Sequence, residues 1–251
     1  MKLGALLGPI ADATNQNSLA EQARMLEAEG YSSLWTAQAI GRGFMMTDPF
    51  VTLSIAAAVT HEVELGTAIL QLPFYEVADV ALKSFSLMQA SGNRLLLGVG
   101  AGSTESDHLA HHGKFEQRFR SFNEKLTELK TVFATGQCHG VDLAPWENVQ
   151  GGPPLIYGTW GAGVSRAAEE FDAWIGSAMH RSIDQLEEAI AGYRAAGGTR
   201  AIATTIVLTP NTDLGELGEM MQRLSKVGFD DAVVMFTPGA PDAASIRNVL
   251  V

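Results

Sequence analysis

Apolar segments of strand length alternate with amphipathic segments along the whole chain. Eight short runs consist mainly of Val, Ile, Leu, Ala and Gly, which is typical of parallel strands that are buried on both faces of a sheet. The predicted strands are Lys2–Leu7, Ser33–Ala37, Val63–Leu70, Arg94–Val99, Pro154–Tyr157, Ala173–Ala178, Arg200–Leu208 and Asp231–Phe236. Segments with helical spacing separate these runs, so the pattern predicts regularly alternating strands and helices.

The helical segments carry their own start and packing signals. Two pairs have the three-residue spacing of a capping box, in which side chains satisfy the free backbone N–H groups of a helix start: Ser18 with Glu21, and Asp213 with Glu216. A 4-3-4-3-4 stripe predicts a long helix with its apolar side in the core: Phe115, Phe119, Phe122, Leu126, Leu129 and Phe133. We expect a last helix at Ala243–Leu250 and a loop at Gln137–Pro153.

The order of these elements predicts one (β/α)8 TIM barrel over residues 1–251. The segments Glu29–Trp35 and Val227–Val233 repeat one unit, in which a helix stops at a glycine, an aromatic residue follows and a strand begins. A length of about 250 residues is typical of such a barrel. A doubly wound sheet would need a G-x-G-x-x-G turn after the first strand. The chain has Gly8-Pro9 there instead, and its glycine-rich turn follows the fourth strand.

Composition and charge narrow the possible partners. Apolar residues make up 46% of the chain and charged residues 18%, which is enough to build a sizeable core. The net charge of −11 disfavours nucleic acid and anionic membranes, because both require clustered Lys and Arg. Cys138 is the only cysteine, so no intrachain disulfide can form. No run reaches the roughly 18 apolar residues of a membrane helix, and we expect a cytoplasmic protein that binds a small molecule.

The chemistry of a barrel of this type is expected at the carboxyl ends of its strands. The residues at these ends are Asp12, Gln38, Gln71, Ser103, Thr159, Trp160, His180, Asn211 and Thr237. Alternate glycines at Gly98, Gly100 and Gly102 would let a ligand approach the backbone, whose N–H groups suit a phosphate; tight packing is the alternative explanation. A second turn of small residues follows the fifth strand. Its Trp160 either stacks on an aromatic cofactor or plugs the barrel.

Three segments together resemble the luciferase-like flavin-dependent oxidoreductases. They are Leu65–Ile69, Asn93–Gly102 and Phe119–Glu124, and they are similar in particular to the branch that uses the deazaflavin coenzyme F-420. The resemblance implies hydride transfer between F-420 or FMN and a small organic substrate, in a homo-oligomer, most simply a dimer. An FMN-dependent monooxygenase that uses externally reduced flavin and oxygen remains an alternative. A non-catalytic flavin-binding barrel is a third possibility.

The resemblance also implies which residues would bind the cofactor. In the family the third strand contains a bulge, often with a cis peptide, that supports one face of the ring; here it falls at Ala68-Ile69. The loop after strand four contacts the phosphate-bearing chain, which points to Ala101, Gly102, Ser103 and Ser106. The turn after strand five supplies further backbone contacts, here at Gly158, Thr159 and Gly161, with Trp160 beside them. Dehydrogenases of the F-420 branch that oxidise sugar phosphates have a histidine and a glutamate where this chain has Gln38 and Ser103. That reaction is therefore not expected here.

The histidines offer one catalytic candidate. His180 is the only histidine at the carboxyl end of a predicted strand, where its imidazole could donate or accept a proton near neutral pH, although a structural role is equally compatible with its position. Gln38 could orient the substrate. A cluster with metal-like spacing is formed by Asp107, His108, His111 and His112, of which His108 and His112 would share one face of a helix. A third anchor is missing, so we expect a solvated helical face and no metal there.

Overall fold

A computed structural model of the chain describes residues 1–8, 18–179 and 181–249. Its main sheet is entirely parallel and closes into a barrel, because β3 pairs with both β2 and β5. The predicted TIM barrel is therefore confirmed. The strands of this sheet are β1 (Lys2–Leu6), β2 (Ser33–Thr36), β3 (Glu64–Thr67), β4 (Leu70–Gln71), β5 (Leu95–Gly100), β8 (Leu155–Gly158), β9 (Ala173–Ser177), β10 (Ala201–Leu208) and β11 (Asp231–Phe236).

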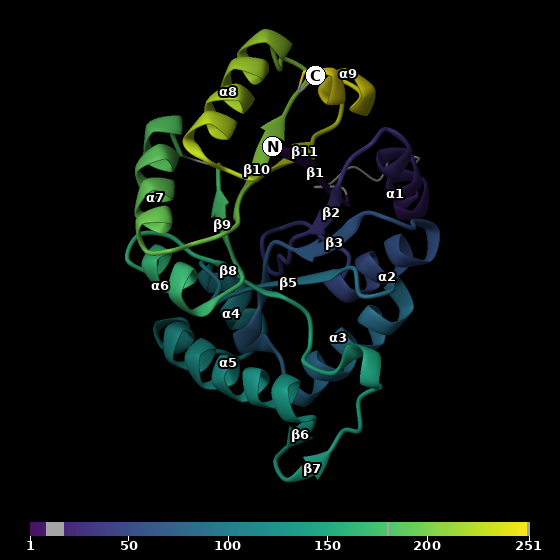
Figure 1. Cartoon of the computed structure of the whole chain (residues 1–251), viewed down its shortest axis with the longest axis vertical. Helices are drawn as coiled ribbons and strands as arrows, with labels where there is room; N and C mark the ends of the chain where they lie inside the picture. The colour runs from purple at the N-terminus through teal and green to yellow at the C-terminus, as the bar shows by residue number, and fades with distance from the viewer. Residues whose placement is uncertain (9–17, 180, 250–251) are drawn as a thin grey trace.

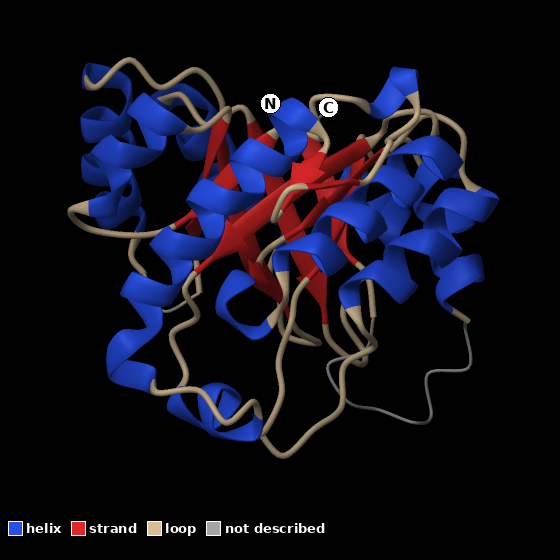
Figure 2. Cartoon of the chain, turned by 90° about the horizontal axis from the view of Figure 1, so that it is seen from below, coloured by secondary structure: helices blue, strands red, loops and turns tan. Residues whose placement is uncertain are grey.

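Helices surround the barrel on its outside, except for the short α4, which lies inside their ring after the carboxyl end of β5 (Figure 1). They are α1 (Leu19–Ala28), α2 (Pro49–Val59), α3 (Val77–Ser91), α4 (Glu105–Ala110), α5 (Arg118–Thr135), α6 (Gly163–Glu170), α7 (Ile183–Ala195), α8 (Leu214–Val227) and α9 (Ala243–Asn248). Seen from below, they flank the central strands on both sides (Figure 2). Within the described residues, no helix is long and apolar enough to cross a membrane.

Two local predictions need correction. The segment expected to be a loop, Gln137–Pro153, contains a short antiparallel hairpin of β6 (Gln137–Cys138) and β7 (Val141–Asp142), which projects from the barrel (Figure 1). The apolar stripe is only partly core, because α5 begins at Arg118 and the Phe119 side chain is 54% exposed. Arg118 covers that ring with its guanidinium, 4.4 Å from the ring centroid.

The third strand position of the barrel is divided into β3 and β4. A cis peptide joins Ala68 to Ile69 between the two halves, which confirms the interruption predicted at this site. The Ala68 N–H donates to the carbonyl of Thr36 at 2.7 Å, and the Thr67 hydroxyl donates to the carbonyl of Gly98 at 2.7 Å. Both neighbouring strands therefore hold the ends of the break in place.

Two apolar layers stabilise the barrel. The larger one lies between the strands and the helices, and the smaller one fills the barrel interior around Trp35, Ile156, Ile175, Ile202 and Val233, all at most 4% exposed. The indole of Trp35 requires a glycine beside it, because a Cβ at Gly66 would lie 2.2 Å from the ring. A Cβ at Gly4 would lie 2.4 Å from the Ser33 hydroxyl, which accepts from the same indole.

A charged layer closes the amino-terminal end of the barrel. The Arg200 guanidinium donates to both oxygens of Glu64, at 2.9 and 2.6 Å, and to both oxygens of Asp231, at 2.8 and 2.9 Å. Asp231 is fully buried. Burial alone would raise the pKa of Glu64, but hydrogen bonds and charge from Arg200 hold that pKa below its ordinary value. One arginine thus satisfies carboxylates from two strands.

Candidate active site

The mouth at the carboxyl ends of the strands has an apolar floor. Leu6, Ala68 and Ile69 are the partly exposed side chains that pack on the inner core from above. The Ile69 side chain needs the neighbouring glycines, because a Cβ would lie 2.5 Å from it at Gly100 and 2.2 Å from it at Gly158. Both glycines are thus explained by packing. Their packing against Ile69 helps to position it in a floor that can take the flat face of an aromatic ring.

Gln38 lies at the edge of this floor and is held in one orientation. Its side-chain oxygen accepts from the backbone N–H of Gln71 at 2.8 Å, and its side-chain nitrogen donates to the Tyr75 hydroxyl at 2.8 Å. Burial raises the pKa of Tyr75, so the phenol keeps its proton. The sequence analysis missed Tyr75. Its position just beyond the third strand, in the run Gln71-Leu72-Pro73-Phe74-Tyr75, was the available signal.

Asp107, on α4, is hydrogen-bonded to the loop after β2 and to β4. It is fully buried, its carboxylate accepts from Arg42 Nε at 3.0 Å, and it also accepts from the side chain of Gln71 at 2.9 Å and from the N–H of Ile40 at 3.2 Å. Burial would raise the pKa of Asp107, but the hydrogen bonds from Arg42 and Gln71 lower it below its ordinary value. The predicted solvated face of α4 is therefore wrong, because Asp107 and His108 both point into the protein.

Gly102 packs closely against this network. Its φ of +81° suits glycine, and a Cβ would lie 2.3 Å from Gln71 Oε1 and 2.9 Å from His108 Nε2. Those two atoms are buried and make no hydrogen bond to a described residue. Burial lowers the pKa of His108, which keeps the imidazole neutral near neutral pH. The side of Gly102 that a side chain would occupy is therefore filled by protein.

We therefore expect Gly102→Ala to lower the unfolding free energy by about 1–3 kcal/mol more than Gly161→Ala, because it adds a steric conflict to an unfavourable φ. Gly161 is the matched control, since it also has a positive φ of +61° but nothing lies within 4 Å of its Cβ position. Urea denaturation of the two variants measures the difference. Equal stability losses would mean that Gln71 and His108 move aside without cost.

The remaining residues predicted in the loop after β5 are in part packed and in part open. Ala101 is buried, and Ser106 is half-buried beside Gly41, whose Cβ position is only 2.9 Å from the Ser106 carbonyl oxygen. Ser103 is exposed. Its hydroxyl is therefore directly accessible to a ligand, while Gly102 can contribute backbone only.

The turn after β8 combines a covered tryptophan with an open glycine. The Trp160 ring is half-buried, lies 6.1 Å from Trp174 and carries the Arg181 guanidinium 3.9 Å from its centroid. The ring is thus wedged between the core and a cation. The Thr159 carbonyl accepts from the Trp174 indole at 3.0 Å, which fixes the turn, and Gly161 stands exposed at its tip.

His180 and Asp12 lie outside the described residues. The neighbouring residues Met179 and Arg181 belong to the connection between β9 and α7. The Arg181 side chain donates to the carbonyl of Ser177 at 3.2 Å.

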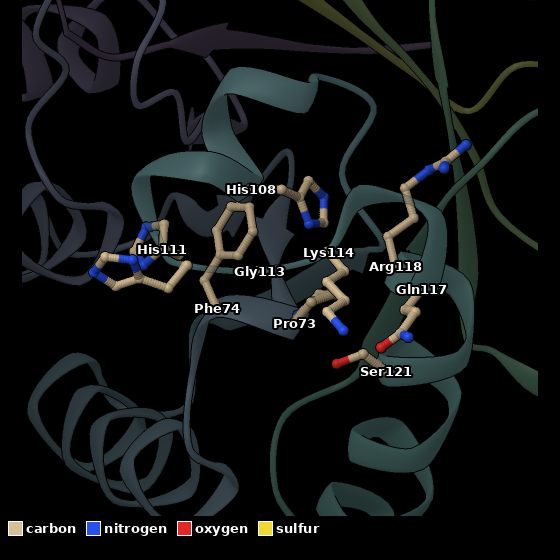
Figure 3. Close-up of a pocket in the computed structure, with 10 residues that line it drawn as sticks. Pro73, Phe74, His108, His111, Gly113, Lys114, Gln117, Arg118 and Ser121 are labelled. Atoms are coloured by element: carbon tan, nitrogen blue, oxygen red, sulfur yellow. The ribbon is translucent and has the colours of Figure 1, made fainter.

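A pocket of about 320 Å³ is lined in part by His108 and by residues of the segment that follows α4. Figure 3 shows the polar ends of Lys114, Gln117 and Ser121 gathered at one side of it and Phe74 beside His108 at the other. The Phe74 ring packs edge-on to His108 at 4.7 Å and stacks on His111 at 4.3 Å. The residues that line the pocket include no carboxylate, although the chain as a whole is acidic.

Comparison with known proteins defines the class of this barrel. The profile of the luciferase-like monooxygenase family matches residues 5–210, so the chain belongs to that family. It is 32% identical over 113 residues to 4-hydroxyprotoasukamycin monooxygenase of Streptomyces nodosus subsp. asukaensis, a match that covers 43% of this chain and 30% of that protein. It is 24% identical over 187 residues to limonene 1,2-monooxygenase of Rhodococcus erythropolis, covering 64% of this chain and 48% of that one. The chain thus matches less than half the length of both relatives.

Solved structures agree on the fold. Monooxygenase RslO1 of Streptomyces bottropensis superposes with a TM-score of 0.79 at 16% identity, covering 99% of this chain and 96% of the other. The coenzyme F-420-dependent tetrahydromethanopterin reductase of Methanopyrus kandleri gives a TM-score of 0.76 at 14% identity, with coverage of 99% and 96%. At these identities the likeness describes the barrel architecture.

Proposed function

We propose that the protein is a flavin- or deazaflavin-dependent oxidoreductase that transfers a hydride between its cofactor and a small organic substrate. The observation that carries the proposal is the apolar floor of Leu6, Ala68 and Ile69 at the mouth of a barrel of this family. When bound, F-420 or FMN would supply the hydride chemistry, and the protein would supply position and surroundings. The full activity, the substrate and the choice between the two cofactors belong to the proposal.

The residues present fit such a cofactor. A flat ring would rest on the floor beside the break between β3 and β4, and the phosphate-bearing chain would lie between the loop after β5 and the turn after β8. Ser103 and Gly161 are exposed there, and Ala101, Gly102, Ser106, Gly158 and Thr159 would contribute backbone or close packing. The Trp160 ring is covered by Arg181, so we propose that it stabilises the turn and does not stack on the cofactor.

Two side chains are proposed to act on the substrate. Gln38 is the positioning residue, because Gln71 and Tyr75 fix its amide at the edge of the floor and leave one N–H and one lone pair for a ligand. His180 would donate or accept the proton that accompanies hydride transfer.

The placement of the phosphate can be tested at Gly161. Aspartate and asparagine both tolerate a positive φ and have nearly the same shape, so Gly161→Asp and Gly161→Asn differ mainly in charge. A carboxylate near the cofactor phosphate should weaken cofactor binding about tenfold relative to the amide variant at low salt. Fluorescence titration with F-420 and with FMN measures this. Equal dissociation constants for the two variants would place the phosphate elsewhere.

A flavin monooxygenase is the second candidate, because relatives that this chain matches are named monooxygenases. Oxygen uptake with externally reduced FMN and no F-420 activity would favour it. A cofactor that binds but is neither reduced by substrate nor reactive with oxygen would favour a non-catalytic flavin-binding barrel.

We further propose a cytoplasmic homodimer that acts as a single domain on small molecules, without nucleic acid or membrane partners. An apolar hollow of about 420 Å³ on the outer face of α3 supports self-association, with Leu82 at 61% and Trp146 at 53% exposure on its rim. Light scattering coupled to gel filtration should give twice the chain mass of 26.7 kDa. A mass of 26.7 kDa at micromolar concentration would contradict the dimer.

A further inference from the structure

Three different metal-binding side chains converge where the β6–β7 hairpin meets α5. They are Glu128 on α5, Cys138 at the end of β6 and His139 in the hairpin turn, and their ligand atoms all lie within 4.8 Å of one another. The cluster lies at the base of the hairpin that projects from the barrel, next to the end of α5, so it is separate from the mouth (Figure 1). An inference drawn from it is independent of the proposed oxidoreductase activity.

Two distances in the cluster are close to those of a tetrahedral zinc site. Bond lengths of about 2.3 Å for Zn–S, and about 2.0–2.2 Å for Zn–N and Zn–O, place neighbouring ligand atoms about 3.3–3.6 Å apart. Here Cys138 Sγ lies 3.7 Å from Glu128 Oε1, and His139 Nε2 lies 3.0 Å from the same oxygen. All three ligand atoms lie within 4.8 Å of one another, and the His139 side chain is exposed, so rotation of that side chain can bring its nitrogen to bonding distance of an ion held by the other two.

The surroundings of the three ligands also suit a metal ion. Cys138 is 5% exposed, which protects the sulfur, while the His139 side chain is 80% exposed and the Glu128 side chain 35% exposed, so an ion can enter from solvent. Thiol, imidazole and carboxylate together are a donor set typical of Zn²⁺.

We propose that Glu128, Cys138 and His139 form a binding site for a divalent zinc-like ion that ties the β6–β7 hairpin to α5. Water would complete the four-coordinate shell. Metal coordination replaces the Cys138–Glu128 and His139–Glu128 contacts, which in the metal-free protein hold the same two elements together more weakly. Because the ion binds the folded chain, it raises the melting temperature.

Titration of the full-length, chelator-treated and reduced protein with Co²⁺ tests the site. Thiolate-bound Co²⁺ gives an intense charge-transfer absorption, and Cys138 is the only cysteine that could produce it. We expect one equivalent of Co²⁺ to bind, Zn²⁺ to displace it, and Cys138→Ser to abolish the band. Glu128→Gln and His139→Asn should each weaken binding tenfold or more, and Zn²⁺ should raise the melting temperature of the wild type but not of Cys138→Ser.

His112→Asn is the matched control. His112 and His139 are both exposed and both have a positive φ, 54° and 48°, which asparagine also tolerates. The control should bind Co²⁺ like the wild type. Absence of the band at millimolar Co²⁺ would overturn the proposal. A band that Glu128→Gln and His139→Asn leave unchanged would overturn it as well, because the cysteine would then bind metal alone.

Discussion

Replacing His180 with glutamine is expected to lower turnover by roughly 10²–10⁴-fold, which is the usual contribution of a general acid or base. Glutamine keeps hydrogen-bonding capacity but cannot exchange a proton near neutral pH. Cofactor affinity should stay within about twofold, because the side chain is proposed to act on the substrate. The turnover of the wild type should change with pH near neutrality, and this part of the pH–rate profile should be absent in the variant. Steady-state kinetics across pH, with cofactor titration in parallel, measures all three effects.

His61→Gln is the control for a general effect of losing an imidazole. His61 is exposed and lies between α2 and β3, at the opposite end of the barrel strands from the mouth. Its variant should keep wild-type turnover. If His180→Gln also turns over within a few-fold of wild type, His180 takes no part in the reaction, and Gln38 becomes the leading candidate for contact with the substrate.

Replacing Arg200 with methionine is expected to lower the free energy of unfolding by about 3–5 kcal/mol, because it removes the ion-pair partner of the fully buried Asp231 and leaves Glu64 with only the more distant Lys2. Asp231 is fully buried and Glu64 is about a quarter exposed, and Arg200 donates to both oxygens of each. Denaturant unfolding monitored by circular dichroism measures the loss. Arg120→Met is the matched control, because its exposed pair with Glu124 should contribute little to stability. Equal losses in the two variants would contradict the role of the buried cluster.

The same cluster predicts a direction for the effect of pH on stability. The pKa of Glu64 is lower in the folded protein than its ordinary value of 4.5. Its contribution to stability is therefore complete above the unfolded-state pKa and is lost as the pH falls through the folded-state pKa. Arg200→Met removes the partner that lowers this pKa most and leaves the weaker effect of Lys2. The variant should accordingly lose less stability than the wild type between pH 5 and pH 3, as measured by denaturant midpoints.

The barrel could be predicted from the sequence because the apolar runs of its strands and the spacing of its helices are both local features. Strands such as Asp231–Phe236 are continuous apolar runs, and the cap at Ser18 forms the full reciprocal box with Glu21 that the spacing predicted. The interruption at Ala68-Ile69 was different. Nothing in the apolar run Val63–Leu70 marks a break, and only the family resemblance located it.

The network below the mouth could not be predicted, because its partners are distant in sequence. Asp107 is 65 positions from Arg42 and 36 positions from Gln71 in the sequence. The polar pattern of a six-residue helix does not reveal which face turns inward. The glycines in and after β5 were similarly ambiguous. Gly100 and Gly102 could have served a ligand, but the space beside each is filled by Ile69 or by Gln71 and His108.

Equilibrium dialysis of the wild-type protein against F-420, and separately against FMN, tests the central claim most directly. The visible absorption of each cofactor reports its concentration on both sides of the membrane. We predict that at least one cofactor accumulates on the protein side to one equivalent per chain. At subsaturating cofactor, Gly161→Asp should bind about tenfold less cofactor than Gly161→Asn. Equal concentrations of both cofactors across the membrane, at wild-type protein concentrations in the hundreds of micromolar, would contradict a flavin or deazaflavin site at the mouth.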